Sequence, residues 1–303
     1  MKVKIFLFVL LIGAFFSSDA QRWKRYRWEA IYGAGMANFL GELGGANQVG
    51  TDYMKDFDWK AVRPALMVGM RFKQTQQISH KVNLTLALIA GNDQWTEDPI
   101  RLSRNLNFRS PLVEVGYNFE FYLKKEKRGH RFKLRGVRGL RNMGLYPYGF
   151  FGVSGFFFSP QGKVGDKWEG LKQLTTEGQG ISETRSEYSK FQLAIPLGIG
   201  IKYAIDRRWL ISIEYGMRKT FTDYIDDVST TYFPSDRLEA EGYGALSSLA
   251  ADPTQGAWVG AKSFQQRGDP TDNDSYLFLI ISANYKLKTG RNNMPKVFGR
   301  RGR

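Results

Sequence analysis

The feature that most constrains this fold is a regular alternation of apolar and polar side chains. It is clearest between residues 111 and 123, where every odd position is apolar: Pro111, Val113, Val115, Tyr117, Phe119, Phe121 and Leu123. Several of the even positions between them are charged or polar, among them Glu114, Asn118 and Glu120. Successive side chains of a β-strand point to opposite faces, so the pattern predicts a strand that separates an apolar from a polar environment.

The alternation recurs in seven further segments, which makes eight in all. They span residues 28–40, 62–72, 81–88, 146–158, 191–203, 209–218 and 277–285; the first and fourth, rich in Gly and aromatic residues, alternate less clearly. Segments of about ten residues match tilted strands that cross a bilayer, and closure of an even number leaves no sheet edge. The sequence therefore predicts an all-β fold, an eight-stranded antiparallel transmembrane β-barrel with long extracellular loops. The register over 28–40 and 146–158 is left open.

Charged residues at inward-facing positions predict how the barrel interior is filled. A barrel of eight strands encloses little more than its own side chains. A buried charge without a partner costs several kcal/mol. We therefore expect a plugged lumen in which charges pair, and the narrow bore argues against an ion path. The predicted structural network is Glu29, Arg63, Arg71, Glu114, Glu120, Lys202, Glu214 and Arg218, with Asn83, Asn118 and Asn284 as hydrogen-bonding partners.

The first twenty residues have the pattern of a secretory signal peptide. Lys2 and Lys4 precede an apolar run over 5–16, and Ser18-Asp19-Ala20 supplies small residues for cleavage. The run is shorter than the roughly 20 residues of a spanning helix, which disfavours a membrane anchor. We expect a signal peptide over 1–20, an outer-membrane β-barrel over 21–287 and a basic periplasmic tail over 288–303. Cys is absent, so neither disulfides nor a lipid-bearing cysteine are expected.

The lengths of the links between strands predict the orientation. Bacterial barrels have short periplasmic turns and longer external loops. The links 73–80 and 206–208 are short, whereas those over 41–60, 92–108, 159–190 and 223–274 are long. This places both termini in the periplasm and the long links on the extracellular side of the cell outer membrane. The link 124–145 is the exception, because it is long although it belongs to the periplasmic set.

Basic residues concentrate on the predicted periplasmic side of a chain whose net charge is +15. The long link carries Lys124, Lys125, Lys127, Arg128, Arg131, Lys133, Arg135, Arg138 and Arg141, and the tail carries Lys288, Arg291, Lys296, Arg300, Arg301 and Arg303. Lys286 begins the same basic stretch, and Arg22, Lys24, Arg25 and Arg27 add to it. The favoured interpretation is a docking face for an acidic periplasmic protein. Anionic lipid head groups are the alternative ligand.

Residues of the kind that carry out catalysis are scarce. The chain has no Cys, and its two histidines, His80 and His130, lie in or beside predicted periplasmic links. A lipid-modifying enzyme would need a His near the external rim, so that function is disfavoured. We predict no enzymatic activity, no cofactor, no nucleic acid and no small-molecule substrate.

The last long link is acidic and contains two groups of carboxylates that could bind a metal ion. Asp223, Asp226 and Asp227 form one group and Asp269, Asp272 and Asp274 another, and carboxylate oxygens suit Ca²⁺. Neither group has the Gly-punctuated spacing of a Ca²⁺ loop. A solvated acidic surface is therefore the favoured interpretation, and no metal site is predicted.

Several motifs resemble a known family. They are YGAGMANFLGELGGANQVGT at 32–51, RPALMVGMRF at 63–72, YPY at 146–148, YGMR at 215–218 and TDYIDDVS at 222–229. Together they resemble the PorG-like small outer-membrane barrels of the Bacteroidota type IX secretion system, a similarity that spans nearly all of the chain after residue 20.

The resemblance implies a structural role in protein secretion. Barrels of this family are thought to tie the periplasmic ring of the PorK lipoprotein and PorN to the outer membrane, in a system linked to gliding motility in some species. The basic residues above are then candidate docking residues, a step taken from charge and topology. The alternative is a generic small barrel that serves adhesion or membrane integrity through its extracellular loops.

Overall fold

The computed structural model describes residues 22–43, 59–126, 144–206, 208–257, 260–289 and 294–295. The predicted signal peptide and most of the predicted basic tail lie outside these residues. Eight long strands form the body of the molecule: β1 (Trp28–Leu40), β2 (Arg63–Lys73), β3 (Ile78–Asn92), β4 (Asn107–Tyr122), β5 (Leu145–Phe158), β8 (Phe191–Ala204), β9 (Trp209–Thr220) and β10 (Ser275–Leu287).

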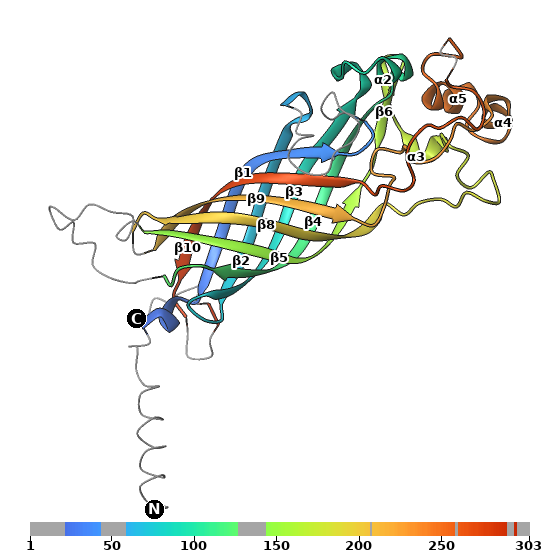
Figure 1. Ribbon diagram of the computed structural model, residues 1–303. Helices are drawn as coiled ribbons and strands as arrows, with labels where there is room; N and C mark the ends of the chain where they lie inside the picture. The colour runs from blue at the N-terminus through green and yellow to red at the C-terminus, as the bar shows by residue number, and fades with distance from the viewer. Residues whose placement is uncertain are drawn as a thin grey trace, which may run out of the picture.

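Each strand pairs with two antiparallel neighbours. The order runs β3-β2-β1-β10-β9-β8-β5-β4, and pairing of β3 with β4 closes the ring (Figure 1). The first and last strands, β1 and β10, lie side by side from Trp28 opposite Leu287 to Leu40 opposite Ser275. The chain is therefore a closed eight-stranded antiparallel barrel, which confirms the predicted fold.

The structure determines the register of β1 and β5, which the sequence pattern does not predict. β1 pairs continuously with β2 from Trp28 opposite Phe72 to Ala37 opposite Arg63. β5 pairs with β8 in one register, but the ladder is interrupted between Phe151 and Ser154. The gap faces Pro196, which has no N–H to donate to a neighbouring strand.

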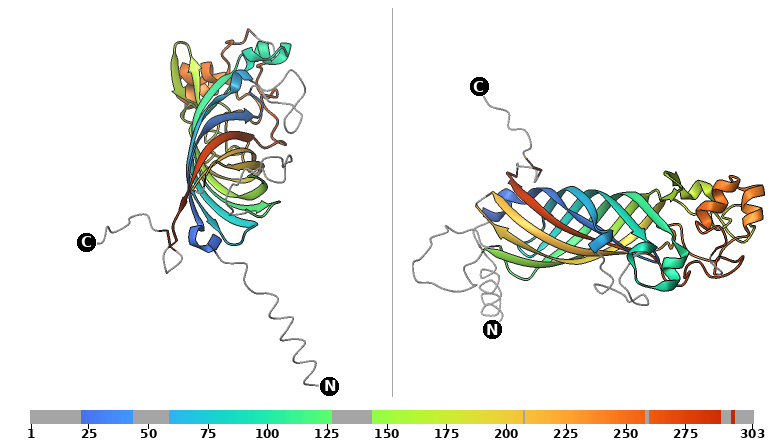
Figure 2. Two further views of the ribbon diagram at one scale, coloured as in Figure 1. Left: turned by 90° about the vertical axis from the view of Figure 1, so that its left-hand side faces the viewer. Right: turned by 90° about the horizontal axis from the view of Figure 1, so that it is seen from above.

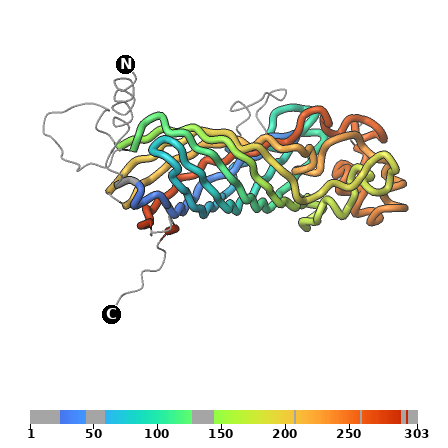
Figure 3. The backbone as a smooth tube through the Cα atoms, turned by 90° about the horizontal axis from the view of Figure 1, so that it is seen from below, coloured from blue at the N-terminus to red at the C-terminus, as the bar shows by residue number. Residues whose placement is uncertain are grey.

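The links at one end of the barrel fold into a compact assembly, which we call the cap. It comprises residues 93–106, 159–190, 221–257 and 260–274, and lies at the end opposite to the start of β1 and the finish of β10 (Figures 2 and 3). The cap contains η4 (Asp93–Trp95), α2 (Pro99–Arg104), β6 (Gln161–Val164), β7 (Lys167–Gly170), α3 (Leu171–Leu174), α4 (Ser235–Glu241) and α5 (Ala245–Ala251). The short turns η1 (Arg22–Tyr26) and η3 (Trp59–Ala61) precede β1 and β2. No helix among the described residues is long and apolar enough to span a membrane.

Local sequence explains the short helix α2. Asp98 caps its N-terminus by accepting a hydrogen bond from the Ile100 N–H, and Pro99 supplies a preset backbone angle in the first turn. Asn105 ends the helix in the left-handed region. The hairpin of β6 and β7, by contrast, lies in the segment 159–190, where the sequence pattern predicts only a link.

The main hydrophobic core joins the cap to the barrel. Phe156 and Phe158 of β5 pack with Tyr276 and Phe278 of β10, and this cluster continues to Ile225 in the cap. These side chains lie inside the barrel at its cap end, because they occupy the inward phase of their strands. The cap is thus packed onto the barrel by apolar contacts as well as by the polar contacts described below.

Candidate functional site

The centre of the barrel interior holds an ion-pair network organised around Arg71. The Arg71 guanidinium is fully buried and contacts carboxylates from three strands. Its Nε lies 2.6 Å from Glu120 Oε2, and its Nη1 lies 2.9 Å from Glu29 Oε2. Nη2 lies 3.3 Å from Glu214 Oε1. A single cation therefore ties together β1, β4 and β9 across the interior.

Two buried lysines balance the remaining negative charge. Lys81 Nζ lies 2.6 Å from Glu214 Oε2, and Lys202 Nζ lies 3.0 Å from Glu29 Oε2. With Arg71 these make three cations for three carboxylates, and Lys73 Nζ, 2.6 Å from Glu29 Oε1, adds a fourth cation at the edge of the group. Because isolated buried charges are costly, the pairing explains how these ionisable side chains are tolerated in so narrow an interior.

Two tyrosines donate hydrogen bonds to carboxylates of this network. The Tyr122 hydroxyl donates to Glu120 Oε2 at 2.6 Å, and the Tyr148 hydroxyl donates to Glu214 Oε1 at 2.5 Å. The Tyr148 ring fits against β8 only because residue 200 is Gly: a Cβ there would lie 2.4 Å from the ring's Cζ. The aromatic and Gly content of the strands therefore has a packing role inside the barrel.

Further ion pairs lie on either side of this network, toward the two ends of the barrel. Toward the cap, Arg218 Nε lies 3.2 Å from Glu114 Oε2, and the Tyr276 hydroxyl donates to the same oxygen at 2.8 Å. At the opposite end, Lys73 and Lys286 both pair with Glu126. Burial would raise the pKa of Glu126, but the two lysines outweigh it and lower that pKa to about 2.

Seven of the eight predicted network residues are buried and ion-paired, but Arg63 is placed differently. Its Nη1 donates to the backbone oxygens of Lys60 and Val62, and its guanidinium lies 5.2 Å from the Trp95 ring centroid. The prediction for Arg63 was wrong because alternation determines the face of a strand and not the depth, and Arg63 begins β2 at the cap end. That the lumen is plugged to solutes stays a prediction.

Four charged residues of the interior were missed: Lys73, Lys81, Glu126 and Lys286. Lys81 has the inward phase of its strand, so the alternation already contained the signal. Lys286 was grouped with the basic tail, yet it is buried in β10. Glu126 follows the end of β4, where no periodicity remains to indicate its side.

The predicted docking residues are only partly covered by the described chain. Lys125 and Lys288 are exposed and Lys124 is half-buried, all at the end where β1 begins and β10 finishes. At that end Thr289 N donates to Arg25 O, and Arg27 N donates to Thr289 Oγ1, so the two terminal segments meet. The remaining predicted residues lie outside the described chain: Lys127, Arg128, Arg131, Lys133, Arg135, Arg138, Arg141, Arg291, Lys296, Arg300, Arg301 and Arg303.

His80, one of the two histidines, lies on the outside of the barrel. Its ring nitrogens are within hydrogen-bonding distance of the Tyr117 hydroxyl, at 2.7 Å, and Gln74 Oε1, at 2.8 Å. It stacks on Tyr117 and has an edge contact with Phe119. These contacts form no catalytic pair with a carboxylate or serine. His130 lies outside the described residues.

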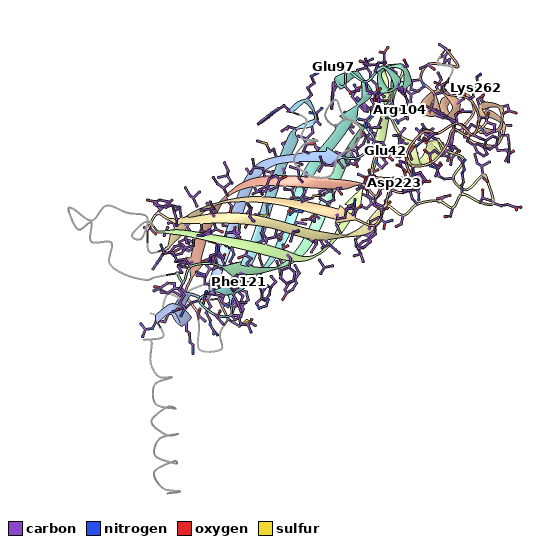
Figure 4. The ribbon with its side chains drawn as sticks, in the orientation of Figure 1. Glu42, Glu97, Arg104, Phe121, Asp223 and Lys262 are labelled. Atoms are coloured by element: carbon purple, nitrogen blue, oxygen red, sulfur yellow. The ribbon has the colours of Figure 1, made fainter. Side chains whose placement is uncertain are left out.

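The outer surface of the barrel is apolar. Leu197 and Ile199 are 64% and 67% exposed, and the pattern continues around the strands. Other exposed apolar side chains are Leu66, Val68, Val82, Leu84, Leu86, Leu88, Val113, Val115, Phe151, Val153, Leu193, Ile195, Ile201, Ile211, Ile213 and Ile281. Exposed aromatic residues lie near both ends of the strands, with Phe121 at the end far from the cap (Figure 4). Charged side chains inside and apolar ones outside reverse the usual arrangement of a water-soluble protein.

The cap has a polar core of its own. Arg267 Nη1 lies 2.9 Å from Glu177 Oε1 and donates to Asp227 O at 2.6 Å. Arg104 donates to both oxygens of Asp93 at 2.8 Å and links the two groups through Arg267 O. The last long link is therefore folded around buried polar contacts and is not a solvated chain.

The acidic residues of that link divide into two groups. Asp269 and Asp272 are exposed, but Asp223, Asp226, Asp227 and Asp274 are buried. The interpretation of a solvated acidic surface was therefore wrong for these four. One oxygen each of Glu42, Asp226 and Asp274 lies within 4.8 Å of the others, an arrangement open to a metal ion.

Residues 3–249 match a family described as a domain of unknown function, DUF6089. The chain belongs to the DUF6089 family. The match covers all of the barrel strands except β10 and extends into the cap as far as α5. Among curated proteins, none is similar enough to this family member to count as a relative.

Several solved structures are similar to this DUF6089 chain at low identity. Neisserial surface protein A matches at 10% identity with a TM-score of 0.36, over 86% of this chain and 96% of its own. Ail, the attachment invasion locus protein of Yersinia pestis, matches at 8% identity with a TM-score of 0.35, over 86% and 98%. The outer membrane protein OprG of Pseudomonas aeruginosa matches at 10% identity with a TM-score of 0.34, over 88% and 98%. The barrel itself rests on the strand pairings above, and the resemblance to PorG-like proteins stays a prediction.

Proposed function

We propose that this protein is an integral outer-membrane barrel with a structural role and no enzymatic activity. The observation that carries the proposal is the reversal of polarity, with paired charges inside and a continuous apolar surface outside. Such a surface is stable in lipid, and closure of the barrel leaves no sheet edge unpaired in lipid.

The proposed orientation places the cap outside the cell and the termini in the periplasm. It is supported by loop length, because the turns at the end opposite the cap are short after β2 and β8, at residues 74–77 and 205–208. The cap is assembled from much longer links. In this orientation Lys125 and Lys288 face the periplasm.

The finer proposal is that the basic periplasmic end anchors a periplasmic assembly, the PorK and PorN ring of the type IX secretion system. Two features support it: the density of Lys and Arg in the sequence at 124–141 and 288–303, and the resemblance described above. Charge of one sign at one end steers an acidic partner to that end.

A generic barrel that acts through its external loops is the second candidate. The cap favours it, because a polar core such as Arg267 with Glu177 and Arg104 with Asp93 holds a defined external surface. Adhesion or membrane integrity would use this surface and would not need the basic end.

A pull-down from the native outer membrane distinguishes the two candidates. The tagged barrel is compared with a variant truncated after Thr289, which keeps the hydrogen bonds of that residue, and with a variant in which every Lys and Arg of 124–141 is replaced by Gln. Ring proteins that co-purify with the intact barrel and are lost from either variant support the anchor. If no periplasmic protein co-purifies with the intact barrel, the anchor proposal is wrong.

A matched pair of triple substitutions controls for net charge. Lys125, Lys127 and Lys288 are changed to Gln in one variant. In the other, three lysines of the sequence over the cap are changed instead: Lys163, Lys167 and Lys262, all exposed. The anchor proposal expects weaker co-purification only in the first. Equal loss in both would mean that overall charge, and not a docking face, governs retention.

A further inference from the structure

Four carboxylates meet where the cap joins the barrel. Glu42 lies two residues after β1, Asp223 and Asp226 follow β9, and Asp274 directly precedes β10. Figure 4 labels Glu42 and Asp223 at this junction. One oxygen each of Glu42, Asp226 and Asp274 lies within 4.8 Å of the others. Residues almost the whole chain length apart thus bring acidic groups to one place.

Three of the four carboxylates are removed from water, and Glu42 is half-buried. Asp226 and Asp274 are 0% and 1% exposed, and Asp223 is 6% exposed. Among the described residues, no Lys or Arg forms an ion pair with any of the four. The nearest arginines are already engaged, because Arg104 pairs with Asp93 and Arg267 pairs with Glu177.

Backbone groups hold the carboxylates in place but leave oxygens unused. Asp226 accepts from Leu43 N and Val228 N, Glu42 Oε1 accepts from Asp269 N, and Asp274 Oδ2 accepts from Ile225 N. Glu42 Oε2 and Asp274 Oδ1 are buried and have no hydrogen-bond partner.

Asp223 is a second, independent indication. Its carboxylate lies near the Ser229 hydroxyl, yet neither of its buried oxygens has a hydrogen-bond partner of acceptable geometry. Figure 4 labels Asp223 together with Glu42 at this junction. In agreement with that position, its charge contributes to raising the pKa of both Glu42 and Asp274. Buried carboxylate oxygens normally find a donor or a cation.

The electrostatic consequence agrees with the geometry. Burial, together with repulsion from Asp226 and Asp223, raises the pKa of Glu42 to about 10. Burial and the neighbouring carboxylates raise the pKa of Asp223 to about 8. Carboxylates that are buried this close together either hold protons or bind a cation.

We propose that Glu42, Asp226 and Asp274, with Asp223 beside them, bind a hard divalent cation, and that this cation is Ca²⁺. Hard cations take oxygen ligands, and Ca²⁺ accepts carboxylates in the irregular arrangements that loops provide, whereas Mg²⁺ demands near-octahedral geometry and keeps much of its water. The ion neutralises part of the negative charge and uses the unpartnered oxygens. It connects the ends of β1, β9 and β10 and so fastens the cap to the barrel.

Gly41 has a place in this arrangement. A Cβ at position 41 would lie 2.2 Å from Asp274 Oδ1, so only Gly lets this unpartnered oxygen lie against the backbone beside Glu42. The close approach explains why a small residue directly precedes the first acidic ligand.

Calcium binding and cap stability are measured on the full barrel, folded in detergent and stripped with EDTA. Isothermal titration with CaCl₂ and with MgCl₂ gives the affinity for each ion. Trypsin cleavage after Arg267, a residue of the cap that is only 3% exposed, reports cap opening. At a Ca²⁺ concentration of about 100 times Kd, cleavage is expected to slow by about a hundredfold.

Glu42→Gln and Asp274→Asn test the ligands, because each keeps one oxygen for its present backbone donor. Both variants are expected to lose Ca²⁺ binding and Ca²⁺ protection, yet to resist trypsin at least as well as the stripped wild type. That sign separates a lost ligand from a misfolded cap. The matched control is Glu239→Gln, an exposed site in the same link, which should leave binding unchanged.

Three outcomes would overturn the proposal. Wild-type protein that neither binds Ca²⁺ nor gains protection from it would mean that the carboxylates hold protons instead. Equal affinity for Mg²⁺ would remove the assignment to Ca²⁺. Undiminished Ca²⁺ binding in both ligand variants would place the ion elsewhere.

Discussion

Replacement of Arg71 by Met tests the interior network most directly. The side chain keeps much of its length but loses its charge and all of its polar contacts. Arg71 is fully buried, and its ion pairs with Glu120, Glu29 and Glu214 measure 2.6, 2.9 and 3.3 Å. Without it, Glu120 keeps only Lys81, 3.9 Å away, as an ion-pair partner among the described residues. One uncompensated buried charge corresponds to a loss of about 3–5 kcal/mol in the free energy of unfolding.

A double substitution separates charge balance from packing. Arg71→Met combined with Glu120→Gln also removes the carboxylate that has lost its nearest cation, and Gln can still accept the hydrogen bond from Tyr122. We expect the double variant to recover at least about 1 kcal/mol relative to Arg71→Met alone, within the range of coupling between groups in direct contact. The assay is urea unfolding of the barrel in phospholipid vesicles, followed by tryptophan fluorescence.

Arg63→Met is the matched control, because it makes the same change in the same strand at the cap end. Arg63 contacts backbone oxygens and the Trp95 ring and has no place in the interior network. Its loss is expected to cost less than about 1 kcal/mol. If Arg71→Met costs no more than Arg63→Met, or if the double variant is no more stable than the single one, the network does not stabilise the barrel in the way described.

Single substitutions also test the apolar outer surface, the ion pairs of Glu126 and the close contacts of the strand glycines. Leu197→Arg, in the exposed apolar belt, should cost about 2–4 kcal/mol in vesicles, where a cation at mid-depth meets lipid, as urea unfolding would measure. The pKa of Glu126 is lowered to about 2 in the folded state, whereas its unfolded pKa is about 4.3. Its ionised carboxylate should therefore stabilise the barrel above about pH 4.3, and this contribution should be lost as the pH falls through about 2. Glu126→Gln should be less stable than the wild type at neutral pH and lose less stability in acid. Gly198→Ala would place a Cβ 2.3 Å from Tyr215 O and should cost about 1–3 kcal/mol, whereas at Gly149 the nearest atom is 3.9 Å away and the same change should be tolerated, a difference that thermal unfolding detects.

Much of the barrel followed from periodicity alone. The alternation over 111–123 predicted β4 and its two faces, and the same pattern predicted the inward placement of Arg71, Lys202 and Glu214. It worked because a strand has a period of two whatever its neighbours are, and because lipid outside and charges inside make the two faces chemically distinct.

The pairings within the barrel, by contrast, were decided by the tertiary structure. Alternation says that Glu29 faces inward, but it does not say that Glu29 lies beside Lys202, which is 173 positions away. That distance depends on register and on strand tilt. Depth is equally hidden, which is why Arg63 has the inward phase and yet lies outside the network.

For the links between strands, too, the sequence determined less than the tertiary structure did. The sequence by itself determined a closed barrel, because eight alternating segments have few other ways to bury their backbone in lipid. It did not determine that Glu42, Asp226 and Asp274 converge, because loops carry no periodicity and acidic residues in a loop are by default solvated. Only the closure of the ring, which brings the end of β1 beside the start of β10, places these carboxylates together and away from water.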